Sequence, residues 1–148
     1  MRVYADTGFL VSLYGEDDLS DAATALVRPG VTLVLTPLGE AEFANALQLR
    51  IFRRQWTLAE ARAVHDRFRF HVAAGVFHLE ELGQEMWSLA MSLSRRHSAK
   101  LGTRTLDVLH VASVLILKPD AFLTFDERQR KFARAEGLRV LPTRARKR

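Results

Sequence analysis

Short apolar segments alternate with helical segments along the whole of this 148-residue chain. The apolar segments that are bounded by turn or capping residues are predicted to be strands, at residues 3–5, 31–35, 76–79, 121–125 and 139–141. Strands separated by helices of this length pair in parallel, because the chain must cross over between them. The alternation therefore predicts an α/β fold, with a single domain built on a parallel sheet of about five strands and helices on both faces.

The helices between these strands are predicted from apolar periodicity and from residues that cap helix ends. Thr36 followed by Pro37 is typical of a helix start, and Thr57 with Glu60 has the pattern of a capping box. The predicted helices cover residues 9–14, 18–27, 37–53, 58–72, 80–97, 105–117 (or from 103) and 127–136.

The domain is expected to cover residues 1–142, followed by a short basic tail at residues 143–148. The formal net charge is +5, and the tail contributes four positive charges through Arg144, Arg146, Lys147 and Arg148. The chain has no cysteine, which excludes a disulfide scaffold, cysteine-ligated zinc and thiol catalysis. No apolar run is long enough to cross a membrane and the first residues do not resemble a signal peptide, so we expect a cytoplasmic protein without a membrane partner.

Acidic side chains follow two of the predicted strands. Asp6 comes directly after the first strand, and Asp126 comes directly after the fourth. Ligands of open α/β sheets bind outside the carboxyl ends of the strands, so the two carboxylates meet at that edge if the strands are neighbours. A simpler role is open to each of them, because an aspartate in this position can cap the helix that follows.

Two predicted helices carry acidic residues in otherwise apolar surroundings. Residues 106–117 are apolar on every side, and their main polar interruptions are Asp107 and His110, which lie on one face; an earlier helix contains Glu40 and Glu42. A buried carboxylate needs a cation or a hydrogen-bond donor. Clustered carboxylates suit Mg²⁺ or Mn²⁺, although acids in a first helical turn also interact with the helix dipole. His110 is expected to be a hydrogen-bonded core residue rather than a metal ligand.

Four short segments that contain these acids follow one another in a fixed order and span almost the whole chain. They lie at residues 4–11, 36–47, 104–112 and 121–129. Each segment resembles a motif of the PIN domain family, and the set of four is far more specific than any one of them. Among PIN domains, a short chain of this kind is similar to the VapC-type toxins of bacterial type II toxin–antitoxin pairs.

This resemblance implies a metal-dependent endoribonuclease, with Mg²⁺ or Mn²⁺ as its cofactor, a PIN-like sheet with the first strand at its centre, and RNA as its substrate. The positions that match the acidic metal and catalytic site of the family are Asp6, Glu42, Asp107 and Asp126. The residues expected to support that site are Thr7, Asn45 and Thr124. Glu42 is preferred to Glu40 because the residues that follow it match the family pattern, whereas Gly8 replaces a serine that is frequent there.

The resemblance also implies partners. VapC-type relatives pair with a small antitoxin whose C-terminal segment often places a basic side chain in the acidic site, and we expect a cognate antitoxin and a homodimer here. An acidic site repels RNA in the absence of metal, so basic side chains elsewhere must hold the RNA backbone. The candidates besides the tail are Arg50, Arg53, Arg54, Arg95, Arg96, Lys100 and Arg104.

Two alternatives are left open by the sequence. A haloacid-dehalogenase-like phosphohydrolase also has an aspartate at the end of its first strand, but it needs a second aspartate where this chain has Gly8. A non-catalytic PIN-like module could bind RNA or a partner without cutting it, and the presence of all four acids argues against this. Four carboxylates in one pocket are expected to raise each other's pKa values.

Overall fold

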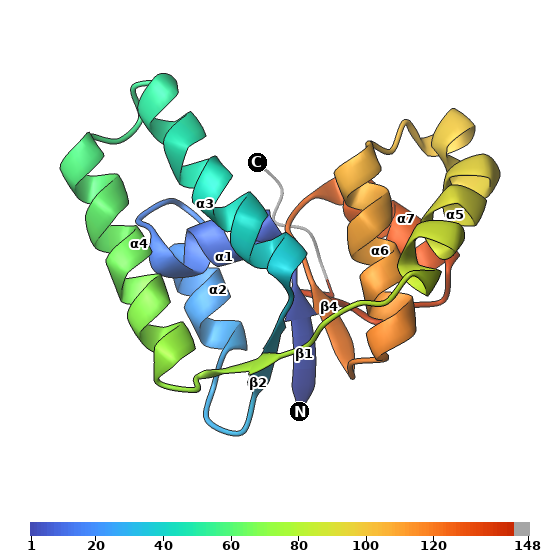
Figure 1. Cartoon of the computed structure of the whole chain (residues 1–148), viewed down its shortest axis with the longest axis horizontal. Coiled ribbons are helices and arrows are strands. Elements are labelled where there is room, and N and C mark those ends of the chain that lie inside the picture. Colours follow the sequence, from blue (N-terminus) through green and yellow to red (C-terminus); the bar gives the residue numbers. More distant parts are fainter. Residues whose placement is uncertain (144–148) are drawn as a thin grey trace.

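The computed structural model describes residues 1–143, so that residues 144–148, which form most of the expected basic tail, lie outside the described residues. Its sheet has five strands in the order β3-β2-β1-β4-β5, and every pair of neighbours is parallel. The strands are β1 (Arg2–Ala5), β2 (Thr32–Leu35), β3 (Phe77–Leu79), β4 (Ala121–Leu123) and β5 (Val140–Leu141). The predicted α/β class, the parallel pairing and the central place of the first strand are therefore confirmed (Figure 1).

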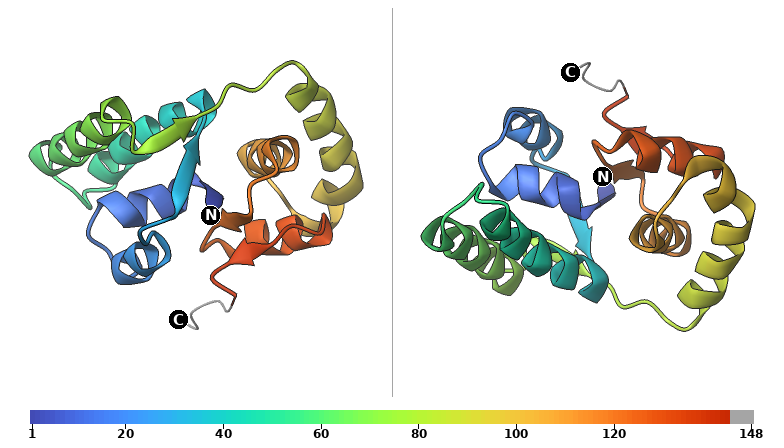
Figure 2. Two further views of the ribbon diagram at one scale, coloured as in Figure 1. Left: turned by 90° about the horizontal axis from the view of Figure 1, so that it is seen from below. Right: turned by 90° about the horizontal axis from the view of Figure 1, so that it is seen from above.

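The helices form two groups, which cover opposite faces of the sheet (Figure 2). On one face lie α1 (Thr7–Tyr14), α2 (Ser20–Leu26), α3 (Pro37–Phe52) and α4 (Leu58–Ala73). On the other face lie α5 (Glu85–Leu101), α6 (Thr105–Leu117) and α7 (Glu127–Ala135).

The central strand β1 faces both cores, because successive side chains of a strand point to opposite sides of the sheet. Val3 and Ala5 pack into the core beneath α1, α3 and α4, whereas Tyr4 packs into the core beneath α5, α6 and α7. Tyr4 is paired in register with Val34 of β2 and with Phe122 of β4, and both of these belong to the same core as Tyr4. The site described below therefore rests on a strand that is buried on both faces.

The predicted helix starts are confirmed by their capping hydrogen bonds. The Thr36 hydroxyl accepts a hydrogen bond from the Gly39 backbone N–H, and Pro37 occupies the first turn of α3. Thr57 and Glu60 form the reciprocal bonds of a capping box at the start of α4. These local bonds fix where each helix leaves the sheet.

The predicted start of α5 is wrong. A helix was expected from residue 80, but α5 begins at Glu85 and ends at Leu101, before Gly102 in a left-handed conformation. The Glu80 backbone N–H instead donates to the Leu35 carbonyl oxygen, and its side chain forms an ion pair with Arg2 at 2.7 Å. Residues 80–84 are consequently used as an extended connection from the edge strand β3 to the opposite face of the sheet (Figure 1).

Strand β4 is also shorter than predicted, because it ends at Leu123 rather than at residue 125. The Thr124 hydroxyl accepts a hydrogen bond from the Asp126 backbone N–H, which turns the chain toward α7.

Within the described part of the chain, no helix is both long enough and apolar enough to cross a membrane.

Candidate active site

Asp6 lies where β1 passes into α1. Its backbone N–H donates to the Leu123 carbonyl oxygen of β4 at 3.1 Å, and its Oδ1 accepts a hydrogen bond from the Phe9 backbone N–H at 2.8 Å. The residue therefore caps α1 and also stands at the carboxyl edge of the sheet between its two central strands. The two roles that the sequence left open for Asp6 are compatible, because the capping bond occupies only one of its carboxylate oxygens.

Asp126 reaches the same edge from β4. Its Oδ1 accepts a hydrogen bond from the Gln129 backbone N–H at 2.9 Å and so caps α7. Thr124, which precedes it by two residues, is fully buried and its hydroxyl is also hydrogen-bonded to the Asp6 carboxylate. Thr124 thus contacts both aspartates, through the Asp126 backbone N–H and the Asp6 carboxylate.

The Asp6 carboxylate has an unusual ionisation equilibrium. The pKa of Asp6 is raised to about 6, chiefly by burial and to a smaller extent by the negative charge of Asp126. The Thr124 hydrogen bond, the charge of His110 and the Phe9 N–H oppose this shift but do not overcome it. A buried carboxylate of this kind is strongly stabilised by a cation, because a cation restores the charged form.

Glu42, on α3, is held by a chain of buried side chains. Its Oε2 is 2.5 Å from His110 Nε2, and the other ring nitrogen of His110, Nδ1, is 2.9 Å from the Tyr4 hydroxyl. His110 and Tyr4 are only 3% and 1% exposed. The expectation that His110 is a hydrogen-bonded core residue is therefore confirmed, and its partner is one of the four candidate acids.

The expectation that all the acids raise each other's pKa values is wrong for Glu42. Partial burial raises the pKa of Glu42, but the hydrogen bond and charge of His110 outweigh burial, so the pKa lies below its usual value. Thr7 contributes in the same direction from the first turn of α1. The Thr7 hydroxyl is buried and makes no hydrogen bond of ordinary geometry within the described residues.

Asp107 is engaged by two neighbouring groups of the chain through one of its oxygens. Its Oδ2 accepts a hydrogen bond from the Arg104 backbone N–H at 2.8 Å and lies 3.5 Å from Arg128 Nε on α7. Asn45 is exposed, and no hydrogen bond joins its side chain to any group of residues 1–143, Glu42 included. Glu40 is partly exposed in the first turn of α3 and has no hydrogen-bonded or ion-paired partner among the same residues.

The donor set suits a hard divalent cation. Among residues 1–143, no three Asp, Glu or His side chains are already arranged around one point that could hold a metal ion. The chemistry still fits, because Asp6 and Asp126 are interacting carboxylates and the Thr7 hydroxyl beside Glu42 is buried without a hydrogen bond of ordinary geometry. Carboxylate and hydroxyl oxygens are the donors that Mg²⁺ and Mn²⁺ take in proteins.

Comparison with known protein families identifies the family of this chain. The sequence profile of the PIN domain matches residues 3–135, which is most of the chain. The chain belongs to the PIN domain family. Membership of this family removes the haloacid-dehalogenase-like alternative. No curated protein matches the sequence.

Solved structures share the fold of this PIN domain. Mycobacterium tuberculosis VapC20, a sarcin–ricin loop cleaving toxin, superposes with a TM-score of 0.66 at 18% identity, over 92% of this chain and 95% of that one. A chain of VapBC2 from Rickettsia felis, bound to a DNA fragment from their promoter, has a TM-score of 0.64 at 15% identity over 95% and 97%. FitAcB from Neisseria gonorrhoeae has a TM-score of 0.65 at 13% identity over 93% and 95%. At these identities the likeness is one of fold.

The basic residues of this PIN domain that were proposed to hold RNA fall into two groups. One group lies at the end of α3 and the other at the end of α5 and the start of α6, on either side of the carboxyl edge of the sheet (Figure 1). Arg50 and Arg96 form ion pairs, with Asp17 at 3.8 Å and with Glu136 at 3.3 Å. Of these candidates, five have side chains that make no hydrogen bond or ion pair within residues 1–143, namely Arg53, Arg54, Arg95, Lys100 and Arg104.

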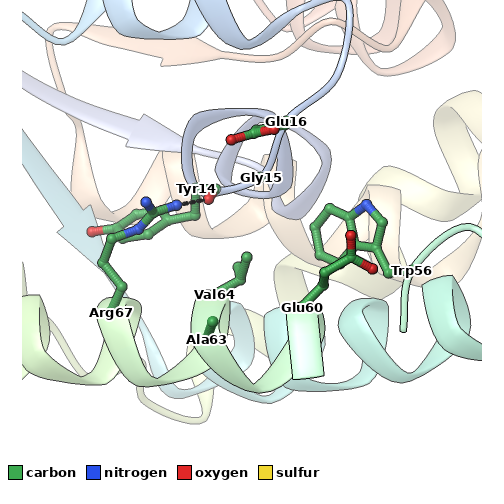
Figure 3. A pocket seen from close by; sticks show the side chains of 8 residues that line it. All are labelled: Tyr14, Gly15, Glu16, Trp56, Glu60, Ala63, Val64 and Arg67. Atoms are coloured by element: carbon green, nitrogen blue, oxygen red, sulfur yellow. Dashed lines mark hydrogen bonds between the residues drawn. The ribbon is translucent and has the colours of Figure 1, made fainter. Parts of the chain in front are cut away.

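A separate cavity of about 310 Å³ lies between the end of α1 and the first half of α4 (Figure 3). Tyr14, Trp56 and Arg67 are among its lining residues, and none of the candidate acids lines it. Arg67 donates a hydrogen bond to the Tyr14 carbonyl oxygen and lies over the Tyr14 ring, which partly fills this end of the cavity.

Sequence reasoning missed the connection from Tyr4 through His110 to Glu42. The only signal available was that Tyr4 lies two residues before Asp6, and His110 three residues after Asp107, inside the segments that carry the acids. Spacing along the chain does not show that these segments meet through their buried faces.

Proposed function

We propose that this PIN domain is an endoribonuclease that uses Mg²⁺ or Mn²⁺ to hydrolyse RNA phosphodiester bonds, and that it is the toxin of a toxin–antitoxin pair. The observation that carries the proposal is the buried Asp6 carboxylate beside Asp126, with a pKa of about 6, at the carboxyl edge of a PIN-type sheet. A structural neighbour, VapC20, is named as a toxin that cleaves the sarcin–ricin loop, which supports RNA as the substrate class.

In this proposal the four acids have different roles. Asp6 and Asp126 would hold the ion, with Thr124 fixing the Asp6 carboxylate, and Glu42 and Asp107 would complete the acidic surface. A divalent ion supplies charge stabilisation of the phosphate and activation of water when it is bound. The unpaired basic side chains at the ends of α3 and α5 would hold the RNA backbone on either side.

The proposed toxin function implies an antitoxin partner. The neighbours include a toxin–antitoxin complex from Klebsiella pneumoniae, at a TM-score of 0.52, as well as VapBC2. A basic side chain from such a partner would pair with the acidic site and exclude the metal ion, because a guanidinium matches carboxylates in charge and geometry. We further propose that the chain forms a homodimer in that complex. Co-expression with the gene immediately upstream, followed by affinity purification, tests the partner.

A non-catalytic module is the second candidate. It is favoured by one observation, that Glu42 and Asp107 are bound to His110 and Arg128 rather than facing a common point. In such a module the acids would serve packing alone, and the protein would bind RNA or a partner without cutting it.

A cleavage assay separates the two candidates. The purified chain is incubated with single-stranded and loop RNA in Mg²⁺ or Mn²⁺, and parallel samples contain EDTA. We expect cleavage that EDTA abolishes, and we expect the folded variant Asp6→Asn to lose at least about 100-fold in rate, since asparagine still caps the helix but lowers the site's charge. Cleavage that persists in EDTA would contradict the metal proposal, and no cleavage under any condition would support the binding module.

A further inference from the structure

Three side chains from three different elements form a continuous polar chain through the core. Tyr4 comes from β1, His110 from α6 and Glu42 from α3. The hydroxyl of Tyr4 meets Nδ1 of His110 at 2.9 Å, and Nε2 of His110 meets Oε2 of Glu42 at 2.5 Å. The first two members are almost completely buried, and the Glu42 side chain is 20% exposed at the site. The chain therefore runs from the interior of the sheet to the acidic edge.

The geometry places a hydrogen on Nε2 of His110, because the Glu42 carboxylate beside that nitrogen can only accept. A tyrosine hydroxyl carries its proton at neutral pH and can donate it to Nδ1. A neutral imidazole that accepts at Nδ1 carries its own hydrogen on Nε2, which is the nitrogen that faces Glu42. Tyr4 and Glu42 thus hold the ring of His110 from its two nitrogens, and the Nε2 hydrogen fixes the position of one Glu42 oxygen.

We propose that Tyr4 and His110 are positioning residues that hold the Glu42 carboxylate in place in the acidic site. The proposal rests on the nuclease function proposed above, because it assigns Glu42 to that site. Neither residue touches RNA or the reacting phosphate, and both act through Glu42. A carboxylate that is oriented by an outer hydrogen-bonded partner is a recurring feature of metal sites, and removal of such a partner commonly weakens metal binding by about 10- to 100-fold.

A purely structural role for the pair is the competing explanation, and the chain supplies a matched control. Tyr14 and His71 form the same kind of pair in the other core, with the Tyr14 hydroxyl 2.8 Å from His71 Nδ1. Among the described residues, no carboxylate is hydrogen-bonded to His71. Tyr14→Phe therefore removes an equivalent tyrosine–histidine bond without altering any contact of the candidate acids.

The first measurement needs no metal and no RNA. Long-range ¹H–¹⁵N spectra of the metal-free protein report which nitrogen of each histidine is protonated. We expect His110 to carry a hydrogen on Nε2 in the wild type and the His110 ring signals to shift in Tyr4→Phe, where the ring loses the partner of Nδ1, while Tyr14→Phe leaves His110 unchanged. A His110 signal that is the same in the wild type and Tyr4→Phe would overturn the proposal, even if the protein proves to be a nuclease.

The second measurement is the affinity for Mn²⁺, followed by electron paramagnetic resonance of the free ion. We expect Tyr4→Phe and His110→Leu to weaken Mn²⁺ binding by about 10-fold or more, and Tyr14→Phe to leave it within about twofold. His110→Gln keeps an amide donor that can reach Glu42, so it should recover part of the affinity lost in His110→Leu. Equal losses in Tyr4→Phe and Tyr14→Phe would overturn the proposal, because they would show a general effect on folding.

The proposed nuclease function can fail separately. A wild-type protein that binds no Mn²⁺ and cuts no RNA would contradict that function, and with it the assignment of Glu42 to a metal site. A wild-type protein that binds Mn²⁺ and cuts RNA, while Tyr4→Phe retains full affinity and rate, would leave the function standing and contradict only the positioning roles of Tyr4 and His110.

Discussion

Two tyrosine–histidine pairs lie in the two cores of the molecule, on opposite faces of the same sheet. In each pair a tyrosine hydroxyl meets the Nδ1 atom of a histidine, at 2.9 Å for Tyr4 with His110 and at 2.8 Å for Tyr14 with His71. The pairs differ in their surroundings. The Tyr14 ring packs against the rings of Phe68, Phe43 and Phe77, whereas the Tyr4 pair continues to a carboxylate.

The two pairs differ in what the second ring nitrogen of the histidine reaches, and we propose that this difference separates a pair that serves the site from one that serves packing. His71 lies in the last turn of a half-exposed helix, and its pair joins α1 to α4. His110 lies inside a helix that is buried for most of its length, where an unpaired ring nitrogen would be costly. A polar residue in that position must be satisfied on both nitrogens, and here the second partner is Glu42.

The largest loss of stability is expected from a substitution in the aromatic cluster around Tyr14, which is the aromatic side of this comparison. Phe68 is 1% exposed and its ring centroid lies 4.2 Å from that of Phe43. We expect Phe68→Ala to lower the free energy of unfolding by about 3–5 kcal/mol, measured by urea denaturation. Phe70→Ala is the control, because Phe70 lies in the same helix but is largely exposed, and it should change stability by less than about 1 kcal/mol. A loss of Mn²⁺ affinity in folded Phe68→Ala would contradict the separation of the two sides.

The largest loss of activity is expected from a substitution among the candidate acids around Glu42, which is the acidic side of this comparison. Glu42→Gln removes the charge at the end of the Tyr4–His110 chain, and we expect RNA cleavage to fall by about 100-fold or more. Glu40→Gln is the matched control, because Glu40 lies on the same helix without a partner in residues 1–143, and its rate should stay within about threefold. If Glu40→Gln is inactive and Glu42→Gln is active, the assignment of the helix acid is wrong.

A pH series sharpens the comparison, because among residues 1–143 the one carboxylate with a raised pKa, Asp6, lies on the acidic side. Asp6 has a pKa of about 6 in the folded protein and 3.8 as its ordinary value, so its contribution favours folding at low pH. That contribution is lost as the pH rises through 6. Relative to Asp6→Asn, the metal-free wild type should lose roughly 2–3 kcal/mol of unfolding free energy between about pH 4 and pH 7. Urea denaturation of both proteins at each pH measures this difference. If the unfolding free energies of the two proteins change equally with pH, Asp6 does not have the raised pKa.

The smallest expected effect is the stability change on removing either tyrosine hydroxyl. Tyr4→Phe and Tyr14→Phe each leave one histidine nitrogen without its partner, and we expect each to cost about 1 kcal/mol in thermal or urea unfolding. Equal stability losses combined with unequal Mn²⁺ affinities would separate the two pairs by function rather than by packing. A loss several times larger for Tyr4→Phe than for Tyr14→Phe would instead mark its pair as mainly structural.

The sequence predicted those parts of the fold that depend on neighbouring residues. Capping residues such as Thr36 and Thr57 act within one helical turn, so their helix starts were found correctly. The start of α5 was missed because Leu82 continues the apolar period of the helix backwards, while the bond from Glu80 to the Leu35 carbonyl is made across the sheet. A contact between residues so far apart in the chain has no effect on the apolar periodicity of the sequence.

The candidate site shows the same limit. Asp6 and Asp126 could be placed at one edge because both follow strands, and the neighbouring positions of β1 and β4 bring them together. The opposite pKa shifts of Asp6 and Glu42 could not be predicted, since they depend on burial for one and on His110 for the other. The packing of α6 against the sheet decides that difference.

The strand order has a consequence for synthesis of the protein. β1 is made first and pairs with β2 as soon as residue 35 is available, but its other neighbour, β4, begins only at Ala121. While the ribosome makes the residues in between, one edge of the central strand and the Tyr4 face of the sheet have no partner. An unpaired apolar strand edge is a template for association with other chains. The half that carries α1 to α4 can therefore begin to pack during translation, whereas Asp6 meets Asp126 only when the chain is almost complete.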